Sequence, residues 1–232
     1  MEFKKGCPYG THRVISPKGV LPQPADVIDN TMEIYDNEVL IDVKTLNIDS
    51  ASFTEIVRRA CDGKKPADIE GDEVEMNKVK ETMLSIVEKA GKHKNPWTGS
   101  GGMLLGTVKE IGPAYVGELK VGDKIATLVS LSLTPLKLEE ITEVRPDIDQ
   151  VDIKGKAILF QSGIYAKLPE DMAEGLALSA LDVAGAPAQT AKLCQYGQNV
   201  VILGAGGKSG MLCCYEAKKR VGVTGKVIGL TN

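Results

Sequence analysis

The sequence is poor in aromatic side chains and in histidine, and it contains no long apolar run. Aromatic residues make up 4% of the 232 positions, with one Trp, and there are two His. A membrane-spanning helix needs roughly 20 consecutive apolar residues, and a secretory signal needs an apolar stretch behind its basic start. Because we find neither pattern, we expect no membrane segment and no export.

The chain also lacks excess positive charge and a paired pattern of cysteines. It has 28 Lys and Arg against 31 Asp and Glu, a formal net charge of −3. This balance gives no electrostatic reason to expect nucleic acid or a membrane surface as a partner. The cysteines are odd in number and none is spaced Cys-x-x-Cys: they are Cys7, Cys61, Cys194, Cys213 and Cys214. Reduced thiols in the cytoplasm fit this pattern best.

What the chain does contain is, first, a β-rich region with a helical insert, over residues 1–170. Residues 33–47 alternate apolar and polar side chains, the period of a half-buried strand. Within the insert at about 60–95, apolar residues recur at helical spacing from 76 to 90, and Gly91 is the expected C-cap. Further short strands are predicted at 102–112, at 119–130 and within 151–168.

Residues 171–232 have a different pattern, which predicts the beginning of a parallel α/β domain. Residues 172–196 are rich in Ala and Leu and are expected to be helical, with Pro187 at a start or a kink. A strand at 200–203, a helix at about 207–220 and a strand at 225–230 then form a β-α-β unit. A lone β-α-β unit buries too little surface to stand alone. We therefore expect either a fragment or completion of the sheet by another polypeptide.

The glycine-rich turn in "VVILGAGGKSG" raises the choice between ATP and a dinucleotide. A Walker A loop ending at Gly207-Lys208-Ser209 would need glycine at position 202, which is Ile202. Gly204 and Gly206 instead supply the first two glycines of the dinucleotide motif, with Ser209 at the third position and Gly210 after it. A purely structural strand-turn-helix is the alternative. The predicted cofactor-binding residues are Gly204, Gly206, Gly207, Lys208, Ser209, Gly210, Thr231 and Asn232.

The second strand is followed by Thr231 and Asn232, with no carboxylate to bind a ribose 2′-hydroxyl. Room is therefore left for a 2′-phosphate, and both NAD and NADP stay open as cofactors.

The order of "GGMLLGTVKEIG", "LKVGDKIATL", "YAKLPEDM" and "VVILGAGGKSG" resembles the medium-chain dehydrogenase/reductase superfamily. The resemblance implies a GroES-like β-barrel domain followed by a Rossmann domain. It places Gly102 where the zinc-binding histidine belongs and Asp49 near the position of a zinc-binding cysteine. No cysteine lies in the region of the third ligand, "SALDVAGAPAQT", and no four-cysteine lobe follows Gly112. We therefore predict neither a catalytic nor a structural zinc.

Longer blocks carry a closer resemblance, among them "YGTHRVISPKGVLPQPA", "NPWTGSGGMLLGTV" and "LALSALDVAGAPAQTAKL". They are similar to the L-erythro-3,5-diaminohexanoate dehydrogenase family of anaerobic lysine fermentation, over nearly the whole chain outside the insert. The family is longer than this chain. The resemblance implies NAD(P)-dependent oxidative deamination at C3, giving 5-amino-3-oxohexanoate and ammonia, and we expect a homodimer. A zinc-free quinone or enone reductase and a non-catalytic barrel module are the alternatives.

Such a reaction needs a base near the C3 nitrogen and groups that hold the rest of the diamino acid. Asp49, near the zinc-ligand position of the superfamily, is predicted as base or ammonium anchor; the alternative is that it caps a turn with Ser50 and Ser52. Ser50, Thr98 and Ser100 are predicted to contact substrate, although Thr98 and Ser100 could equally shape a turn.

Asp182 is an acidic residue in a run of small apolar residues, and it is the second predicted catalytic residue. Its alternative role is to cap a helix. Arg13 is predicted to bind the substrate carboxylate through two parallel hydrogen bonds. The two histidines, His12 and His93, are expected to have surface or structural roles.

Overall fold

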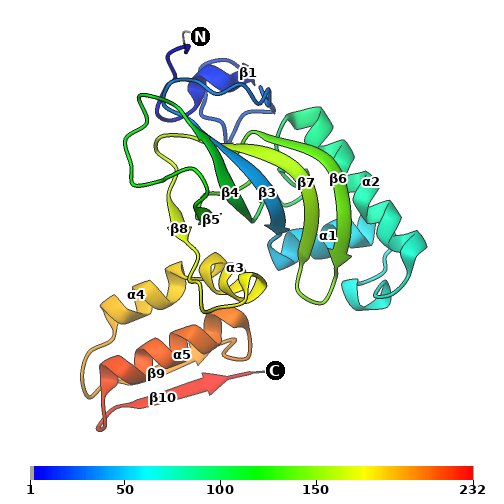
Figure 1. The fold of residues 1–232 in the computed structure, drawn as a ribbon. Coiled ribbons are helices and arrows are strands. Elements are labelled where there is room, and N and C mark those ends of the chain that lie inside the picture. Colours follow the sequence, from blue (N-terminus) through cyan, green and yellow to red (C-terminus); the bar gives the residue numbers. More distant parts are fainter. Residues whose placement is uncertain (1–2, 232) are drawn as a thin grey trace. The chain divides into compact units, whose positions relative to one another are not determined.

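The computed structural model describes residues 3–231, and the chain divides into two compact units between Leu168 and Pro169. Figure 1 shows the elements of both units, and each unit is described here by itself. Within residues 3–231, no helix combines the length and the apolar composition that crossing a membrane requires.

The first unit is built on one antiparallel six-stranded sheet with the strand order β6-β7-β3-β4-β5-β8. Its strands are β3 (Val39–Asn47), β4 (Met103–Ile111), β5 (Lys124–Thr127), β6 (Leu136–Arg145), β7 (Gln150–Leu159) and β8 (Tyr165–Lys167). A separate pair, β1 (Val14–Ser16) and β2 (Val27–Ile28), follows the short helix η1 (Thr11–Arg13). In the part of the chain that the structure describes, the two end strands, β6 and β8, do not pair with each other. The sheet is therefore open in its hydrogen bonding.

The expected strand at 33–47 begins only at Val39, because a turn in which Glu38 N donates to Tyr35 O precedes it. β3 pairs with β4 on one side and with β7 on the other. Its apolar side chains belong to two buried clusters: Ile41 and Leu46 are in the main one, and Leu40 is in another. The expected strands at 102–112, 119–130 and 151–168 are confirmed in part as β4, β5, β7 and β8, whereas β6 was not predicted.

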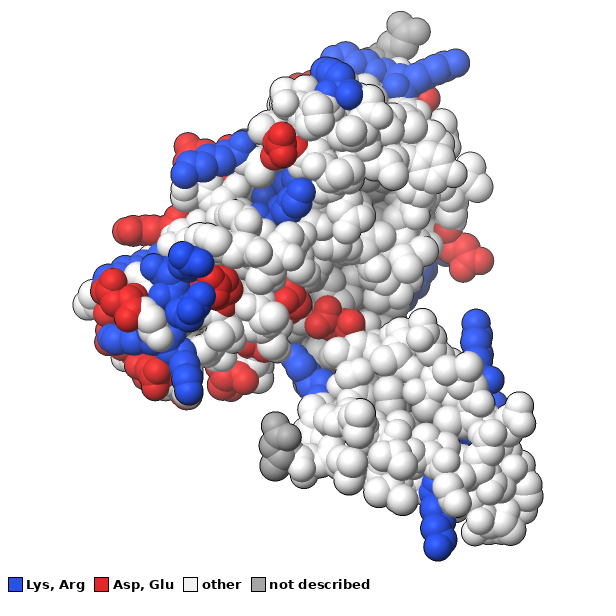
Figure 2. Space-filling model, turned by 180° about the vertical axis from the view of Figure 1, so that it is seen from behind, with Lys and Arg blue, Asp and Glu red and all other residues white. Residues whose placement is uncertain are grey.

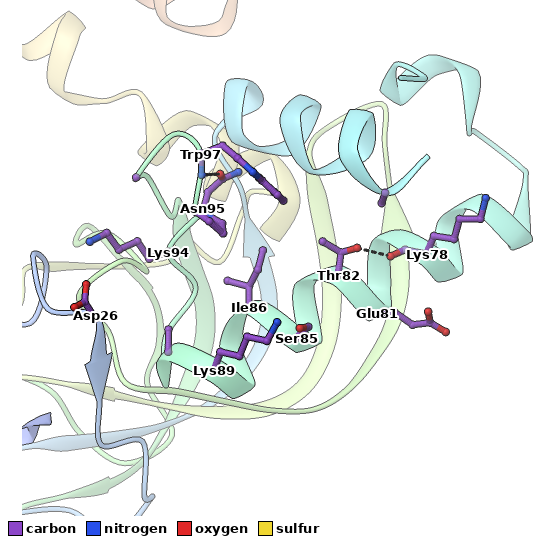
Figure 3. A pocket seen from close by; sticks show the side chains of 14 residues that line it. Asp26, Lys78, Glu81, Thr82, Ser85, Ile86, Lys89, Lys94, Asn95 and Trp97 are labelled. Carbon is purple, nitrogen blue, oxygen red and sulfur yellow. Dashed lines mark hydrogen bonds between the residues drawn. The ribbon is translucent and has the colours of Figure 1, made fainter. Parts of the chain in front are cut away.

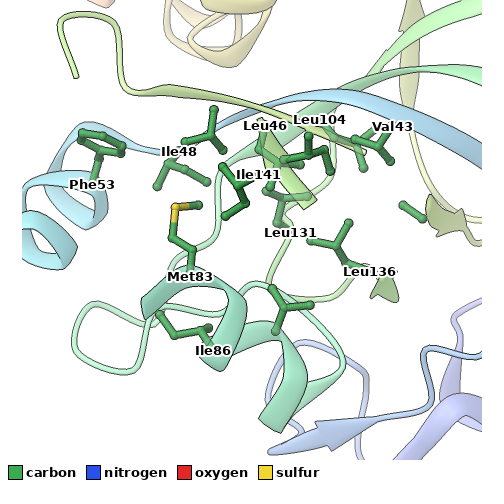
Figure 4. Packing of buried hydrophobic residues seen from close by; sticks show 14 of the residues in the cluster. Val43, Leu46, Ile48, Phe53, Met83, Ile86, Leu104, Leu131, Leu136 and Ile141 are labelled. Atoms are coloured by element: carbon green, nitrogen blue, oxygen red, sulfur yellow. The ribbon is translucent and has the colours of Figure 1, made fainter. Parts of the chain in front are cut away.

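Helices α1 (Ser50–Ala60) and α2 (Glu73–Ala90), with the short η2 (Pro66–Asp68) between them, pack on the sheet. Figure 4 shows the side chains that meet there: Phe53 of α1 and Met83 of α2 face Leu46 of β3 and Leu104 of β4. All four are fully buried, and burial of such a side chain stabilises a fold by about 1.5–3 kcal/mol.

The ends of α2 follow from its sequence. Asp72 Oδ1 accepts hydrogen bonds from Val74 N and Glu75 N at the N-terminus, as an N-cap does. Gly91 ends the helix with φ of 72° and donates its N–H to Val87 O, so the predicted C-cap is confirmed.

The second unit contains α3 (Glu174–Asp182), α4 (Gly185–Leu193), β9 (Asn199–Leu203), α5 (Lys208–Val221) and β10 (Lys226–Leu230). β9 and β10 pair in parallel, and α5 connects them, which confirms the predicted β-α-β unit. Pro187 lies in the first turn of α4, where its missing N–H leaves no hydrogen bond unmade.

Charges of both signs are mixed on the surface of the first unit. Figure 2 shows Lys and Arg beside Asp and Glu where α1, η2 and α2 come together. Glu55 pairs there with Arg58 and Arg59, and Glu75 pairs with Lys64 and Lys78. The expectation that nucleic acid is no partner stays a prediction.

Candidate active site

Asp49 lies at the junction between β3 and α1. Its Oδ1 accepts a hydrogen bond of 2.9 Å from Ser52 N and so caps α1, which is one of the two roles that the sequence left open. The other carboxylate oxygen, Oδ2, is shielded from solvent and has no hydrogen-bond partner. The cap therefore uses one carboxylate oxygen and leaves the other buried and unpaired.

The loop 93–102, which leads into β4, packs against the start of α1. Asn95 organises this loop: its Oδ1 accepts from Trp97 N at 2.8 Å and from Thr98 N at 3.1 Å, and its Nδ2 donates to Ser52 O at 3.0 Å. Asn95 is buried. The prediction from sequence omitted it, although the pair Asn95-Pro96 is a turn signal that could have pointed to it.

Gly101 and Gly102 bring two segments of the chain together. A Cβ atom on Gly102, whose φ is +88°, would lie 2.0 Å from Asn47 O and 2.8 Å from Ile48 Cα. On Gly101, a Cβ atom would lie 2.6 Å from His93 O. The residues just before Asp49 and the backbone of His93 thus touch the same pair of glycines. The new Cβ atom would thus collide with backbone at position 102, where the sequence resemblance predicted the loss of a zinc-binding histidine.

His93 is fully buried beside this glycine pair. Its Nδ1 lies 3.2 Å from Gly101 O, and because a carbonyl only accepts, Nδ1 carries the hydrogen. Nε2 then presents a lone pair, and no hydrogen-bond partner is found for it. Burial lowers the pKa of His93 to about 4, while the Gly101 carbonyl and the charge of Asp49 act in the opposite direction. The ring is therefore neutral near pH 7.

The other residues predicted around Asp49 lie at the same place. Ser50 Oγ bonds Asp149 Oδ2, and Thr98 Oγ1 bonds Ser52 Oγ. Ser100 O accepts a hydrogen bond from the backbone N–H of the loop at Asn95. These contacts shape the loop and the helix start, which was the alternative stated for Thr98 and Ser100. Whether any of them touches substrate stays a prediction.

Arg13 lies in η1, and its guanidinium is occupied by hydrogen bonds within the protein. Its guanidinium makes two hydrogen bonds of 2.7 Å to the carboxylate of Glu38, and it also donates to Thr31 O and Glu33 O at 2.8 Å. Both Arg13 and Glu38 are fully buried. Burial raises the pKa of Glu38, but hydrogen bonds from Arg13 and His12 outweigh it and the net shift is downward. This arrangement favours a structural role over binding of a substrate carboxylate.

In the second unit, the predicted glycine turn lies between β9 and α5. Gly204 has φ of +74°, and a Cβ atom on Gly210 would lie 2.2 Å from Gly204 O. The close packing of helix on turn therefore falls at Gly210 and not at Ser209, the position assigned to it from sequence. Gly206 and Gly207 are exposed, and the N-terminus of α5 has no side-chain cap.

The remaining predicted residues are also in the second unit. Lys208 and Ser209 are half-buried at the start of α5, and Thr231 is exposed after β10. A Cβ atom on Gly206 would lie 3.2 Å from Thr231 Cγ2, so Thr231 flanks the turn. Asp182 is the last residue of α3, where it does not serve as an N-cap. Asn232 lies outside the described residues.

A groove of about 790 Å³ lies on the α2 side of the loop 93–102, and Figure 3 shows the side chains that line it. Lys78, Thr82 and Lys89 of α2 face Asn95 and Trp97 across it. Neither Asp49 nor His93 lines this groove. Among residues 3–231, no group of three or more His, Cys, Asp or Glu side chains is arranged to hold a metal ion.

A family comparison now decides the class of the chain. A sequence model of the L-erythro-3,5-diaminohexanoate dehydrogenase N-terminal domain matches residues 12–169. The chain belongs to this family. The matched L-erythro-3,5-diaminohexanoate dehydrogenase domain includes both Asp49 and His93, and it ends where the first structural unit ends.

Two named relatives extend this result. L-erythro-3,5-diaminohexanoate dehydrogenase of Acetoanaerobium sticklandii is 64% identical over 228 residues, 97% of this chain and 63% of that protein. The protein of the same name from Fusobacterium nucleatum is 66% identical over 230 residues, 98% of this chain and 63% of its own. The chain thus spans less than two thirds of the length of these relatives.

Solved structures are more distant. The human synaptic vesicle membrane protein VAT-1 homolog-like protein is 16% identical, with 84% of this chain and 47% of that chain covered and a TM-score of 0.46. Galactitol-1-phosphate dehydrogenase from Escherichia coli is 17% identical, with 84% and 49% covered and a TM-score of 0.41. Similarity of this size carries no argument about function.

Proposed function

We propose that the full-length protein catalyses the NAD(P)-dependent oxidative deamination of L-erythro-3,5-diaminohexanoate to 5-amino-3-oxohexanoate and ammonia. The observation that carries the proposal is the 64–66% identity to two dehydrogenases of that name over 97–98% of this chain. The quinone reductase and the non-catalytic module that the sequence left open have no comparable support.

The chemistry of the substrate gives Asp49 its role. The C3 ammonium group must lose a proton before its nitrogen lone pair can expel hydride from C3. The nicotinamide supplies the hydride acceptor, water adds to the resulting iminium carbon, and ammonia leaves. Asp49 carries the negative charge at the start of α1, and its carboxylate can hold the ammonium and accept its proton.

The glycine turn fits the pyrophosphate of the cofactor. Gly204 has the positive φ that favours glycine, and a Cβ atom on Gly210 would collide with Gly204 O. The first N–H groups of α5 have no acceptor within the helix. In this proposal the β-α-β unit is the start of a Rossmann domain, and the first unit has a GroES-like fold whose sheet stays open between β6 and β8.

We also propose that the reaction proceeds without zinc. A histidine cannot occupy position 102, because its Cβ atom would lie 2.0 Å from Asn47 O, and proton removal from an amine has less need of a Lewis acid than alcohol oxidation. Elemental analysis of the purified full-length protein should find less than stoichiometric zinc; one zinc per subunit would refute this part of the proposal.

The experiment that tests the function is an assay of the full-length protein with 3,5-diaminohexanoate and each nicotinamide, which follows the absorbance of the reduced cofactor. We expect turnover with at least one of them and release of ammonia in equal amount. Turnover of simple quinones without any turnover of the diamino acid would contradict the proposal. Asp49→Asn should lower kcat by roughly 100-fold, as loss of a general base commonly does.

A further inference from the structure

The turn between β6 and β7 contains Asp149, whose backbone has a φ of +57°. Among residues 3–231, the one other non-glycine residue with positive φ is Asp62, at +50°. This conformation is unfavourable for a residue with a Cβ atom, although Asp and Asn adopt it more readily than most. It persists where the surrounding structure holds the residue in place, and such residues cluster at functional sites. The contacts of Asp149 show what holds it.

Asp149 contacts the segment that joins β3 to α1. Its backbone oxygen accepts a hydrogen bond of 2.9 Å from Ile48 N, and its Oδ2 accepts one from Ser50 Oγ. Ile48 and Ser50 are the residues directly before and after Asp49. Asp149 therefore bonds both neighbours of the proposed base, although it lies 99 positions after Ser50 in the sequence.

The turn that carries Asp149 is itself anchored at both ends. Gln150 Nε2 donates to Asn47 Oδ1 at 3.0 Å, and these two fully buried residues face each other in the register of β7 and β3. At the other end, Arg145 makes hydrogen bonds of 2.9 and 2.7 Å to the carboxylate of Asp152. The turn is thus a fixed support for the segment beside it.

The position of the Asp49 carboxylate depends on this segment. One hydrogen bond holds the side chain: Oδ1 accepts from Ser52 N at 2.9 Å, and Oδ2 has no partner. The backbone on either side of Asp49 therefore sets where the carboxylate lies. Displacement of a catalytic group by about 1 Å can lower a rate by roughly 100-fold, so bonds to Ile48 and Ser50 can act on the reaction without touching the substrate.

We infer that Asp149 is a positioning residue for Asp49: through Ile48 and Ser50 it fixes the backbone that carries the proposed base. The inference rests on the proposed function, in which Asp49 accepts the proton of the C3 ammonium. The role requires the hydrogen bond to Ser50 and not the negative charge of Asp149. Asparagine also accepts a hydrogen bond through Oδ1 and tolerates positive φ, so it should replace Asp149, whereas glycine should not.

The first test does not depend on turnover. Hydrogen exchange of the full-length protein is resolved at the Ser52 amide, which donates to Asp49 Oδ1. Asp149→Gly keeps the backbone conformation and removes the side chain, and we expect Ser52 to exchange about tenfold faster. Asp149→Asn should exchange as wild type does.

The matched control is Asp62→Gly, the same substitution at the other aspartate with positive φ, which lies in the exposed turn after α1. It should leave the exchange rate of Ser52 unchanged. If Asp149→Gly also leaves that rate unchanged, Asp149 does not position Asp49 and the inference is wrong.

The second test measures kcat and KM with 3,5-diaminohexanoate. Asp149→Gly should lower kcat by roughly tenfold or more and leave KM for the nicotinamide unchanged, whereas Asp149→Asn and Asp62→Gly should keep most of the wild-type kcat. Ser50→Ala removes the same hydrogen bond from its other end. The double variant Ser50→Ala/Asp149→Gly should therefore lose no more than either single variant.

Three kinetic results would overturn the inference. A folded Asp149→Gly with wild-type kcat would leave Asp149 a structural role only. An Asp149→Asn as slow as Asp149→Gly would mean that the charge acts and not the hydrogen bond. A raised KM in Ser50→Ala, with losses that add in the double variant, would mean that Ser50 contacts substrate independently of Asp149.

The two experiments separate this inference from the proposed function. If wild-type protein does not turn over the diamino acid, the proposed function fails, and exchange at Ser52 alone decides whether Asp149 positions Asp49. If wild type turns over and Asp149→Gly matches it in both experiments, the inference fails and the proposed function stands. If Asp149→Gly does not fold, Ser50→Ala decides, with faster exchange at Ser52 and a lower kcat expected, and wild-type values would overturn the inference.

Discussion

At the scale of single residues, the tertiary surroundings fix the conformation or the pairing of several groups. Gly102 has positive φ and no room for a Cβ atom, and His93 is buried with a lone pair unpaired. Arg13 and Glu38 form a buried pair that removes both charges from water. Sequence marked Gly102 as a departure from the zinc pattern and Arg13 as a substrate ligand. The sequence showed neither the collision that excludes a side chain at position 102 nor the pairing of Arg13 with Glu38.

Gly102→Ala should destabilise the protein far more than Gly99→Ala. Both glycines have positive φ, +88° and +75°, which costs an L-residue about 1–2 kcal/mol. Only at Gly102 would the new Cβ atom also collide with backbone, since nothing lies within 4 Å of it at Gly99. We expect an additional loss of about 1–3 kcal/mol in the free energy of unfolding, measured by urea denaturation. Equal losses in the two variants would contradict the predicted collision.

Arg13→Met should lower the free energy of unfolding at pH 7 by about 3–5 kcal/mol, because it leaves the carboxylate of Glu38 buried and unpaired. Arg58→Met, which breaks an exposed pair with Glu55, is the control and should unfold at the wild-type urea concentration. If Arg13→Met is stable but has a greatly raised KM for the diamino acid, Arg13 binds substrate, as the sequence predicted.

The sign of the pH dependence follows from the lowered pKa of Glu38 in the folded protein. The pair contributes its full stabilisation above the unfolded pKa of about 4.3, and that contribution disappears as pH falls through the lower folded value. The stability difference between wild type and Arg13→Met should therefore shrink in acid, and a difference that grows in acid would be inconsistent with this account.

At the scale of elements, boundaries followed the sequence where capping and turn residues set them. Gly91 ends α2 as expected, and Pro187 lies in the first turn of α4. Elements whose cause is tertiary were missed. β6 shows no regular alternation of buried and exposed residues and finds its place by pairing with β7. α1 was not predicted, and its N-cap is Asp49, for which the sequence left capping and chemistry open. The turn before α5 was predicted correctly as a whole, with the packing glycine one residue further on.

Gly210→Ala should weaken binding of the nicotinamide nucleotide to the full-length protein by about tenfold or more, a loss of about 1.4 kcal/mol. The new Cβ atom would meet Gly204 O at 2.2 Å and Ala205 Cα at 2.7 Å, so the turn has to open. Gly185→Ala, with nothing within 4 Å, should bind as wild type does. Calorimetric titration measures both, and unchanged affinity in Gly210→Ala would mean that the turn does not hold the cofactor.

At the scale of the whole molecule, the two units differ in how completely they bury apolar surface. The main core cluster of the first unit runs from Val39 to Leu159 and draws on α1, α2 and the sheet. In the second unit, apolar strand residues stay exposed, among them Val201 at 54%, Leu203 at 78% and Leu230 at 50%. Such a surface is normally covered by further structure.

Residues 1–168, expressed alone, should therefore fold and unfold in urea as a single cooperative transition, seen at the same midpoint by far-UV circular dichroism and by fluorescence of Trp97. Residues 169–232 alone should show no cooperative transition, because their sheet lacks a cover for its apolar residues. Aggregation of residues 1–168, or cooperative unfolding of residues 169–232, would contradict this division of stability.

The sequence by itself determined the β-α-β pattern, the end of α2 at Gly91, the position of Pro187 near a helix start, and the family to which the chain belongs. These features depend on local backbone preferences and on long blocks of identical residues. Only the tertiary structure decided that Arg13 is buried against Glu38, that Gly102 excludes a side chain, and that Asn95 ties its loop to the start of α1. Each of those depends on contacts between segments distant in sequence, where burial and exclusion of water fix what a side chain can do, and local pattern contains no record of them.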